Sequence, residues 1–89
     1  MKVVLGLRAR KDLERVRVSA ERDRIVDALA ALQDEAPNLD VKALQGRAGW
    51  RRLRTGHWRI LYRVESDVVA VERIVNRRDL DQAVASLSG

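Results

Sequence analysis

Arginine side chains recur at alternate positions in one short stretch, WRRLRTGHWRILY, which spans residues 50–62. Successive side chains of a β-strand point to opposite faces, so Arg52 and Arg54 share one face, and Arg59 joins them from the strand that follows the turn. Guanidinium groups are costly to bury without a partner, and clustered like charges repel one another. We therefore expect this face to bind an anion, and the planar guanidinium fork suits a phosphate group.

Three neighbours of these arginines are further candidates for binding a nucleic acid. Trp50 shares a face with Arg52 and is expected either to stack on a nucleobase or to pack at the edge of the sheet. Arg63 continues the spacing of Arg59 along the second strand. Arg51 alternates to the opposite face but adds to the local positive charge, and we include it among the candidate phosphate-binding residues.

The positive charge of the chain is concentrated in its second half. Lys and Arg outnumber Asp and Glu by 18 to 13, which gives a formal net charge of +5. Residues 1–41 carry equal numbers of basic and acidic side chains, whereas residues 42–78 carry ten basic and three acidic ones. A genome-wide preference for arginine codons would not concentrate the excess in one segment. The distribution favours a polyanionic partner.

Three predicted strands must position these arginines, at residues 50–55, 57–65 and 68–75. The links between them are short, and Ser66 and Asp67 form a tight turn between the last two. Because neither link is long enough for a crossover connection, we expect the strands to pair antiparallel as a meander.

The N-terminal half is predicted to form a strand followed by two helices. We expect the strand at residues 3–7, a brief helix that ends near Val18, and a second helix at residues 19–36. In the second helix Ile25, Leu29 and Leu32 repeat at helical spacing, and Ser19 is the expected N-cap. Pro37 ends this helix, because the residue before a proline is pushed out of the helical region.

The remaining segments complete the predicted fold. Residues 39–49 are expected to form a loop with at most a turn of helix, and residues 78–87 a final amphipathic helix. We therefore expect one domain over residues 1–89 of the α+β class. It would have an antiparallel sheet of about four strands, two N-terminal helices packed on one face, and a short C-terminal helix.

The composition excludes several kinds of site. The chain has no cysteine and one histidine, which rules out disulfides, thiolate metal sites and an imidazole cluster for zinc. We expect no cofactor. No apolar run approaches the ~20 residues that cross a bilayer, and charge interrupts the N-terminus too early for a secretion signal. A soluble protein of the reducing cytoplasm is the expected class.

A longer pattern around the basic stretch resembles a known family. The segment KALQGRAGWRRLRTGHWRILYRV at residues 42–64, followed by VERIVNRRDL at residues 71–80, is similar to the signature of the RelE/ParE superfamily of bacterial toxins. The upstream segment ARKDLERV at residues 9–16 resembles the first-helix segment of that family. The match spans most of the chain and implies a RelE-like fold, although one scaffold can carry different activities.

The resemblance also implies an activity. RelE-like members are mRNA interferases, which enter the ribosomal A site and cut the message, without a metal, by attack of a ribose 2′-hydroxyl on the adjacent phosphate. By position, Arg52 and Arg54 are expected to hold the RNA backbone and Arg59 to stabilise the phosphorane. Arg77 is expected to assist Arg59 or the leaving group. Preorganised cations are effective there because negative charge develops on the phosphate oxygens in the transition state.

The chain departs from the family pattern after the last strand. Many active members carry His-Arg-x-x-x-Tyr, whereas this chain has Asn76 at the histidine position and Asp81 at the tyrosine position. The remaining candidates for proton transfer are His57, Asp81 and Asp79. ParE-like relatives share the fold, lack the nuclease residues and poison DNA gyrase, so that activity stays open. A catalytically degenerate co-repressor that binds an antitoxin is a third possibility.

The family resemblance implies a partner protein as well. We expect a cognate antitoxin whose C-terminal segment wraps the toxin and covers or distorts the basic face. The net positive charge predicts that this segment is rich in Asp and Glu. The expected resting form is a hetero-oligomer of two chains, or a heterotetramer. The expected target is mRNA in the ribosomal A site, or DNA gyrase in the alternative, and no membrane is involved.

Overall fold

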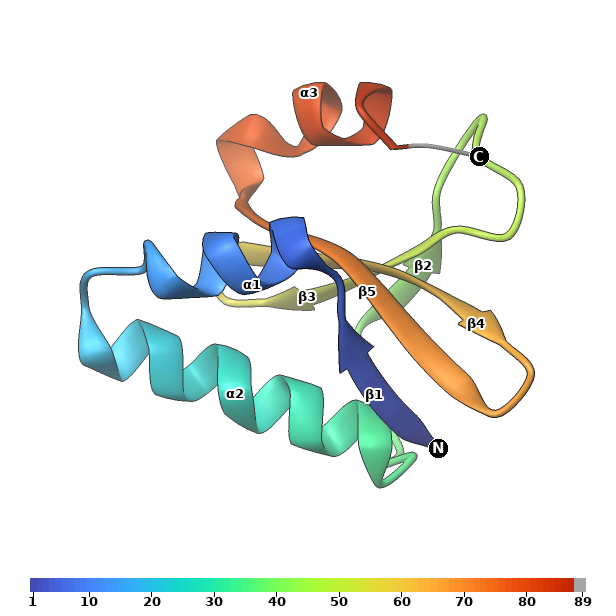
Figure 1. The fold of residues 1–89 in the computed structure, drawn as a ribbon, viewed down its shortest axis with the longest axis horizontal. Helices are drawn as coiled ribbons and strands as arrows, with labels where there is room; N and C mark the ends of the chain where they lie inside the picture. The colour runs from blue at the N-terminus through green and yellow to red at the C-terminus, as the bar shows by residue number, and fades with distance from the viewer. Residues whose placement is uncertain (88–89) are drawn as a thin grey trace.

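A five-stranded sheet with helices on both faces makes up the fold (Figure 1). The structure is a computed structural model, and it describes residues 1–87. In chain order the elements are β1 (Lys2–Leu5), α1 (Leu7–Glu14), α2 (Ser19–Gln33), β2 (Val41–Ala43), β3 (Arg51–Thr55), β4 (Trp58–Glu65), β5 (Val68–Asn76), the 3-10 helix η1 (Arg77–Asp79) and α3 (Leu80–Ala85). The predicted α+β class with two N-terminal helices and a short C-terminal helix is confirmed.

The strands lie in the order β1-β5-β4-β3-β2. The strands β3, β4 and β5 form the predicted antiparallel meander, which follows from their short connections. The sheet has five strands rather than about four, and it is mixed, because β1 pairs parallel with β5. The expectation of a purely antiparallel sheet was therefore wrong at β1, whose pairing with a strand more than sixty residues later leaves no local signal in the sequence.

The segment that was expected to form a loop contains the fifth strand. In it β2 pairs antiparallel with β3, in the register Val41 with Leu53, Lys42 with Arg52 and Ala43 with Arg51. A strand of three residues is too short to show an alternating pattern, so its pairing with β3 decides its conformation. The outermost strand beside the arginines was thus missed.

Some element boundaries also differ from the prediction. The first strand ends at Leu5. Gly6 donates its backbone N–H to the carbonyl oxygen of Val71 (2.8 Å), and the chain then turns into α1. A Cβ atom on Gly6 would lie only 3.3 Å from that oxygen, so the close approach favours glycine. Ser19 is the first residue of α2 rather than its N-cap, and α2 ends at Gln33.

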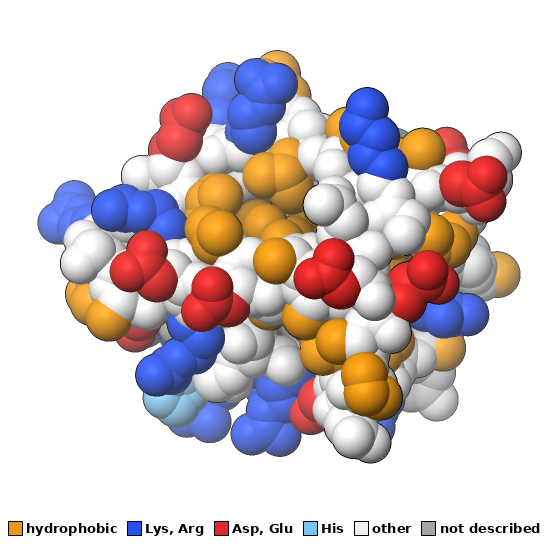
Figure 2. All heavy atoms as spheres, turned by 90° about the horizontal axis from the view of Figure 1, so that it is seen from below, with side chains coloured by type: hydrophobic (Ala, Val, Ile, Leu, Met, Phe, Trp, Pro, Cys, Tyr) orange, Lys and Arg blue, Asp and Glu red, His pale blue; other side chains and the backbone are white. Residues whose placement is uncertain are grey.

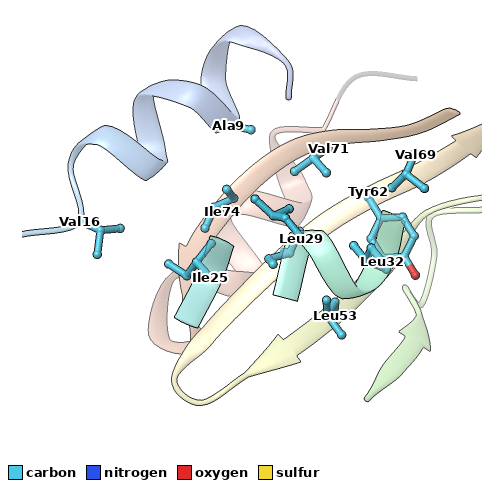
Figure 3. Close-up of a cluster of buried hydrophobic side chains, with 11 residues drawn as sticks. Ala9, Val16, Ile25, Leu29, Leu32, Leu53, Tyr62, Val69, Val71 and Ile74 are labelled. Atoms are coloured by element: carbon cyan, nitrogen blue, oxygen red, sulfur yellow. The ribbon is translucent and has the colours of Figure 1, made fainter. Parts of the chain in front are cut away.

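The main core lies between the sheet and the two N-terminal helices (Figure 3). Helix α2 contributes Ile25, Leu29 and Leu32, which are the residues that the helical spacing indicated. The strands contribute side chains from one face of the sheet, which are Leu53, Ile60, Tyr62, Val69, Val71 and Ile74. Full burial of an aliphatic side chain contributes roughly 1.5–3 kcal/mol, so this cluster stabilises the predicted core side of the sheet.

A second, smaller core lies on the other face of the sheet. Leu61 and Val75 alternate with core residues along β4 and β5 and therefore point away from α2. Together with Trp50 they pack against Ala83 of α3 and Leu87. The C-terminal helix thus covers part of the face on which the arginines lie.

The outer surface on the α2 side carries charges of both signs. Figure 2 shows this face from below, with acidic side chains across its middle, basic side chains around them and hydrophobic side chains in the hollow between. Mixed charges of this kind are ordinary for a solvated helix surface.

Candidate functional site

The hairpin between β3 and β4 sets Arg54 directly opposite Arg59 in the antiparallel register. Gly56 closes the turn with a φ of +59°, a backbone conformation that residues other than glycine rarely adopt. Directly opposed residues of two strands have Cβ atoms about 5 Å apart, and like charges at that separation repel. The hairpin therefore holds two guanidinium groups together at an energetic cost.

Two more arginines join this pair. Arg52 lies two residues before Arg54 and shares its face, which is opposite the face of the buried Leu53. Arg77, the first residue of η1, donates its backbone N–H to the carbonyl oxygen of His57 in the hairpin turn (2.7 Å). We call Arg52, Arg54, Arg59 and Arg77 the arginine cluster.

Arg59 experiences the charges of the whole cluster. Burial lowers the pKa of Arg59, and the positive charges of Arg54, Arg52 and Arg77 lower it further, while Asp40 acts in the opposite direction. Each of these three arginines therefore lies close enough to disfavour the charged form of the fourth. A bound anion would relieve that repulsion, which makes the cluster a candidate phosphate site.

The orientation of Arg59 is fixed by neutral acceptors. Its Nη1 donates to the carbonyl oxygens of Gly56 and Trp58, both at 3.1 Å. Within residues 1–87 its Nη2 and Nε make no hydrogen bond to the protein. A guanidinium group that is held on one side and open on the other is preorganised to receive an anion.

One acidic residue, Asp40, contacts the cluster without any local pattern in the sequence that indicates it. Asp40 lies directly before β2, and its Oδ1 accepts a hydrogen bond from Nη1 of Arg52 (3.2 Å). The carbonyl oxygen of Asp40 accepts from the same Nη1 (3.1 Å) and from the backbone N–H of Arg54 (2.9 Å). Asp40 reaches the cluster through the β2–β3 pairing, so local spacing in the sequence contains no signal for it.

Three of the predicted binding residues do not lie with the cluster. Trp50 is only 3% exposed and packs under α3, so the expectation that its ring could stack on a nucleobase is corrected. Arg63 lies over the Trp50 ring at 5.1 Å from the ring centroid and pairs with Glu65. Arg51 lies on the opposite face, beside Tyr62.

The three candidates for proton transfer are dispersed around the cluster. His57 is an exposed residue of the hairpin turn. Asp81 lies beside Leu44 and Gln45 at a small cavity under α3, and Asp79 lines a separate cavity of about 630 Å³ between α1, the end of β5 and α3. None of the three is among the groups that shift the pKa of Arg59.

Neither a cluster of metal ligands nor a membrane-spanning helix occurs in the part of the chain that the structure describes. Among residues 1–87, no three His, Cys, Asp or Glu side chains gather in a way that could hold a metal ion. No helix in that range is both long and apolar enough to cross a membrane. The arginine cluster therefore remains the strongest candidate site.

The comparisons with known proteins agree on one superfamily. Residues 3–81 match the family described as the ParE toxin of the type II toxin–antitoxin system parDE. No curated protein matches the sequence significantly.

Solved toxin structures have the same fold. A chain of the RelBE2 toxin–antitoxin complex of Mycobacterium tuberculosis superposes with a TM-score of 0.73 at 25% identity, covering 85% of this chain and 96% of that one. A chain of the RelB-RelE complex of Methanococcus jannaschii gives 0.68 at 21% identity, covering 90% and 96%. YafQ of Escherichia coli gives 0.68 at 15% identity, covering 89% and 96%.

Proposed function

We propose that this chain, which belongs to the ParE toxin family of type II toxin–antitoxin systems within the RelE/ParE superfamily, is a ribosome-dependent mRNA endoribonuclease. The observation that carries the proposal is the arginine cluster, in which Arg54 lies directly opposite Arg59 and the positive charges of Arg52 and Arg77 also act on Arg59. Such a cluster is costly unless it receives an anion, and an RNA backbone supplies phosphates at regular spacing.

The proposed reaction uses no metal and depends on stabilisation of the negative charge that develops on the phosphate. A ribose 2′-hydroxyl attacks the adjacent phosphorus, and negative charge builds up on the non-bridging oxygens. Arg59 acts on that charge with Nη2 and Nε, which make no hydrogen bond within residues 1–87, while Arg52 and Arg54 hold the flanking backbone. Arg77 stabilises the phosphorane or the leaving oxygen. Loss of one such preorganised donor typically lowers turnover about 10²–10³-fold.

The proposed resting form is a complex with an acidic antitoxin. RelB and DinJ are antitoxins that were crystallised with their toxins, whose fold this chain shares. An antitoxin segment rich in Asp and Glu that covers the arginine cluster would relieve its repulsion and block access of RNA. Capture of that kind weakens as salt increases, since the charges are solvent-exposed.

A second function is favoured by the family match. The matched family is the ParE toxin, and ParE-like relatives poison DNA gyrase. The chain also has Asn76 and Asp81 at the positions where many active RelE-like members carry His and Tyr. In that case the arginine cluster would bind an acidic protein surface rather than RNA.

Primer extension on ribosome-bound message separates these functions. We expect new 5′ ends inside the reading frame with the wild type, and none with Arg59→Ala. As a matched control, Arg10→Ala removes an exposed arginine from α1 and should cut like the wild type. Absence of cleavage combined with a DNA-damage response would favour the gyrase function. If the wild type neither cleaves message nor induces a DNA-damage response, and growth is unimpaired, a degenerate co-repressor would be favoured.

A further inference from the structure

The proposed cleavage needs an acceptor for the proton of the 2′-hydroxyl, and within residues 1–87 no ion pair joins a candidate expected from the sequence to the arginine cluster. Asp81 and Asp79 line cavities under and beside α3, and His57 is in the hairpin turn. Asp40, in contrast, is bonded directly to a member of the arginine cluster. A carboxylate within reach of a bound phosphate is a suitable general base.

The geometry of Asp40 is that of an oriented base. Its Oδ1 is anchored by Nη1 of Arg52 at 3.2 Å, and the same Nη1 also binds the carbonyl oxygen of Asp40 at 3.1 Å. No hydrogen bond from residues 1–87 reaches Oδ2. The side chain of Asp40 is 48% exposed, whereas that of Arg52 is 14% exposed. One carboxylate oxygen is therefore held by a well-packed partner while the other remains accessible to a ligand.

The charged groups around Asp40 come from three strands. Arg52 and Arg54 extend from β3, Arg59 from β4, and Lys42 lies opposite Arg52 in the β2–β3 register. All of them are cationic, so a phosphate bound by the cluster would lie next to the carboxylate. The cations offset the repulsion between the phosphate and Asp40, which allows both to occupy the site.

We propose that Asp40 is the general base of this toxin, and the proposal rests on the endoribonuclease function proposed above. Oδ2 of Asp40 accepts the proton of the ribose 2′-hydroxyl as the bond between O2′ and phosphorus forms. The bond between phosphorus and O5′ breaks, which leaves a 2′,3′-cyclic phosphate and a 5′-hydroxyl. Solvent water supplies the proton that the leaving O5′ takes up, and Asp40 returns its own proton to solvent.

The alternative is that Asp40 only positions Arg52. Asp40→Asn distinguishes the two roles, because its amide oxygen still accepts the hydrogen bond from Arg52 but cannot take up a proton. For a general base, the rate of single-turnover cleavage on programmed ribosomes should fall about 10²–10⁴-fold. Binding to ribosomes should stay equal or become tighter, since a negative charge has left the cluster. For a positioning residue, cleavage should stay within a few-fold of the wild type.

Two control variants and a rescue experiment complete the test. Asp67→Asn, in the exposed turn between β4 and β5, should cut like the wild type. Asp40→Ala should regain cleavage activity when formate is added, but not with chloride at the same concentration. A variant that is inactive because of a structural defect would not be rescued by formate. Loss of binding in parallel with cleavage in Asp40→Asn, or no rescue by formate, would overturn the proposal.

The outcomes also separate this inference from the function on which it depends. If the wild type cleaves message, Arg59→Ala does not and Asp40→Asn still does, Asp40 is rejected as the base and the endoribonuclease function stands. Absence of cleavage by the wild type would reject both.

Discussion

Asp12 of α1 forms a two-point ion pair with Arg73 of β5, in which Nε donates to Oδ2 at 2.8 Å and Nη2 to Oδ1 at 3.3 Å. The same Oδ2 accepts the backbone N–H of Ile74 at 2.9 Å. These contacts lie where the β4–β5 register shifts by one residue, beyond the last β1 pairing at Val71. The Asp12 side chain thus replaces the missing neighbour strand at this open edge of the sheet.

Removal of the Asp12 carboxylate should destabilise the fold. The two side chains are only 11% and 20% exposed, so Asp12→Ala leaves a partly buried guanidinium group and a backbone N–H without partners. We expect the free energy of unfolding to fall by about 2–3 kcal/mol in urea denaturation. As a control, Asp23→Ala on the exposed side of α2 should change it by less than about 0.5 kcal/mol. Equal effects of the two variants would contradict the assigned role.

Arg52 and Arg51 are sequence neighbours that should differ in RNA binding. Arg52 belongs to the arginine cluster, whereas Arg51 points to the other face beside Tyr62. Arg52→Ala should reduce the slope of log K against log salt by about 0.7 for a single-stranded RNA, because one phosphate contact is lost. Arg51→Ala should leave that slope unchanged. The same reduction in both variants would indicate diffuse attraction rather than a defined face.

Tyr62, the only tyrosine, makes stability depend on alkaline pH. Burial raises its pKa, and the nearby Arg51 opposes this shift. A tyrosine that holds its proton more tightly in the folded state stabilises the folded protein. This contribution is fully present below the unfolded pKa of about 10 and is lost as pH rises through the folded pKa. We therefore expect the free energy of unfolding to fall above about pH 10, and Tyr62→Phe to remove that part of the decline.

Ultraviolet titration of the phenol checks the same assignment in the folded state. The tyrosinate signal should appear only above the ordinary range for tyrosine, and Arg51→Ala should move it to still higher pH. Arg10→Ala is the control for loss of one positive charge from the chain. A signal at the ordinary pH would contradict burial of the Tyr62 ring.

Arg47 should hold the C-terminal end of α3 on the sheet. Its Nη1 donates to the carbonyl oxygen of Leu87 and its Nη2 to that of Ala85, both at 3.1 Å, where a cation also complements the helix dipole. Arg47→Ala should cost about 1–2 kcal/mol and loosen α3 over Trp50. In a Trp58→Phe background, acrylamide should then quench Trp50 fluorescence more strongly. Lys11→Ala on α1 should leave the quenching unchanged.

Elements whose contacts are local could be predicted from the amino-acid sequence. Short links forced β3, β4 and β5 into an antiparallel meander, and the helical spacing of Ile25, Leu29 and Leu32 identified the buried face of α2. Strand alternation grouped Arg52 with Arg54 on one face, and the short hairpin link placed Arg59 on the same face through the antiparallel register.

Features that depend on partners distant in sequence emerged only in the folded chain. No local sequence pattern predicts three of these long-range contacts, which are the parallel β1–β5 pairing, the pairing of the short strand β2 with β3, and the docking of α3 over Trp50. Asp40 reaches Arg52 only because β2 pairs with β3, and Arg77 reaches Arg59 only because η1 begins beside the hairpin turn. Long-range pairing is selected by the burial and hydrogen bonding of the whole sheet, so the side chains that complete the cluster could be identified only in the folded chain.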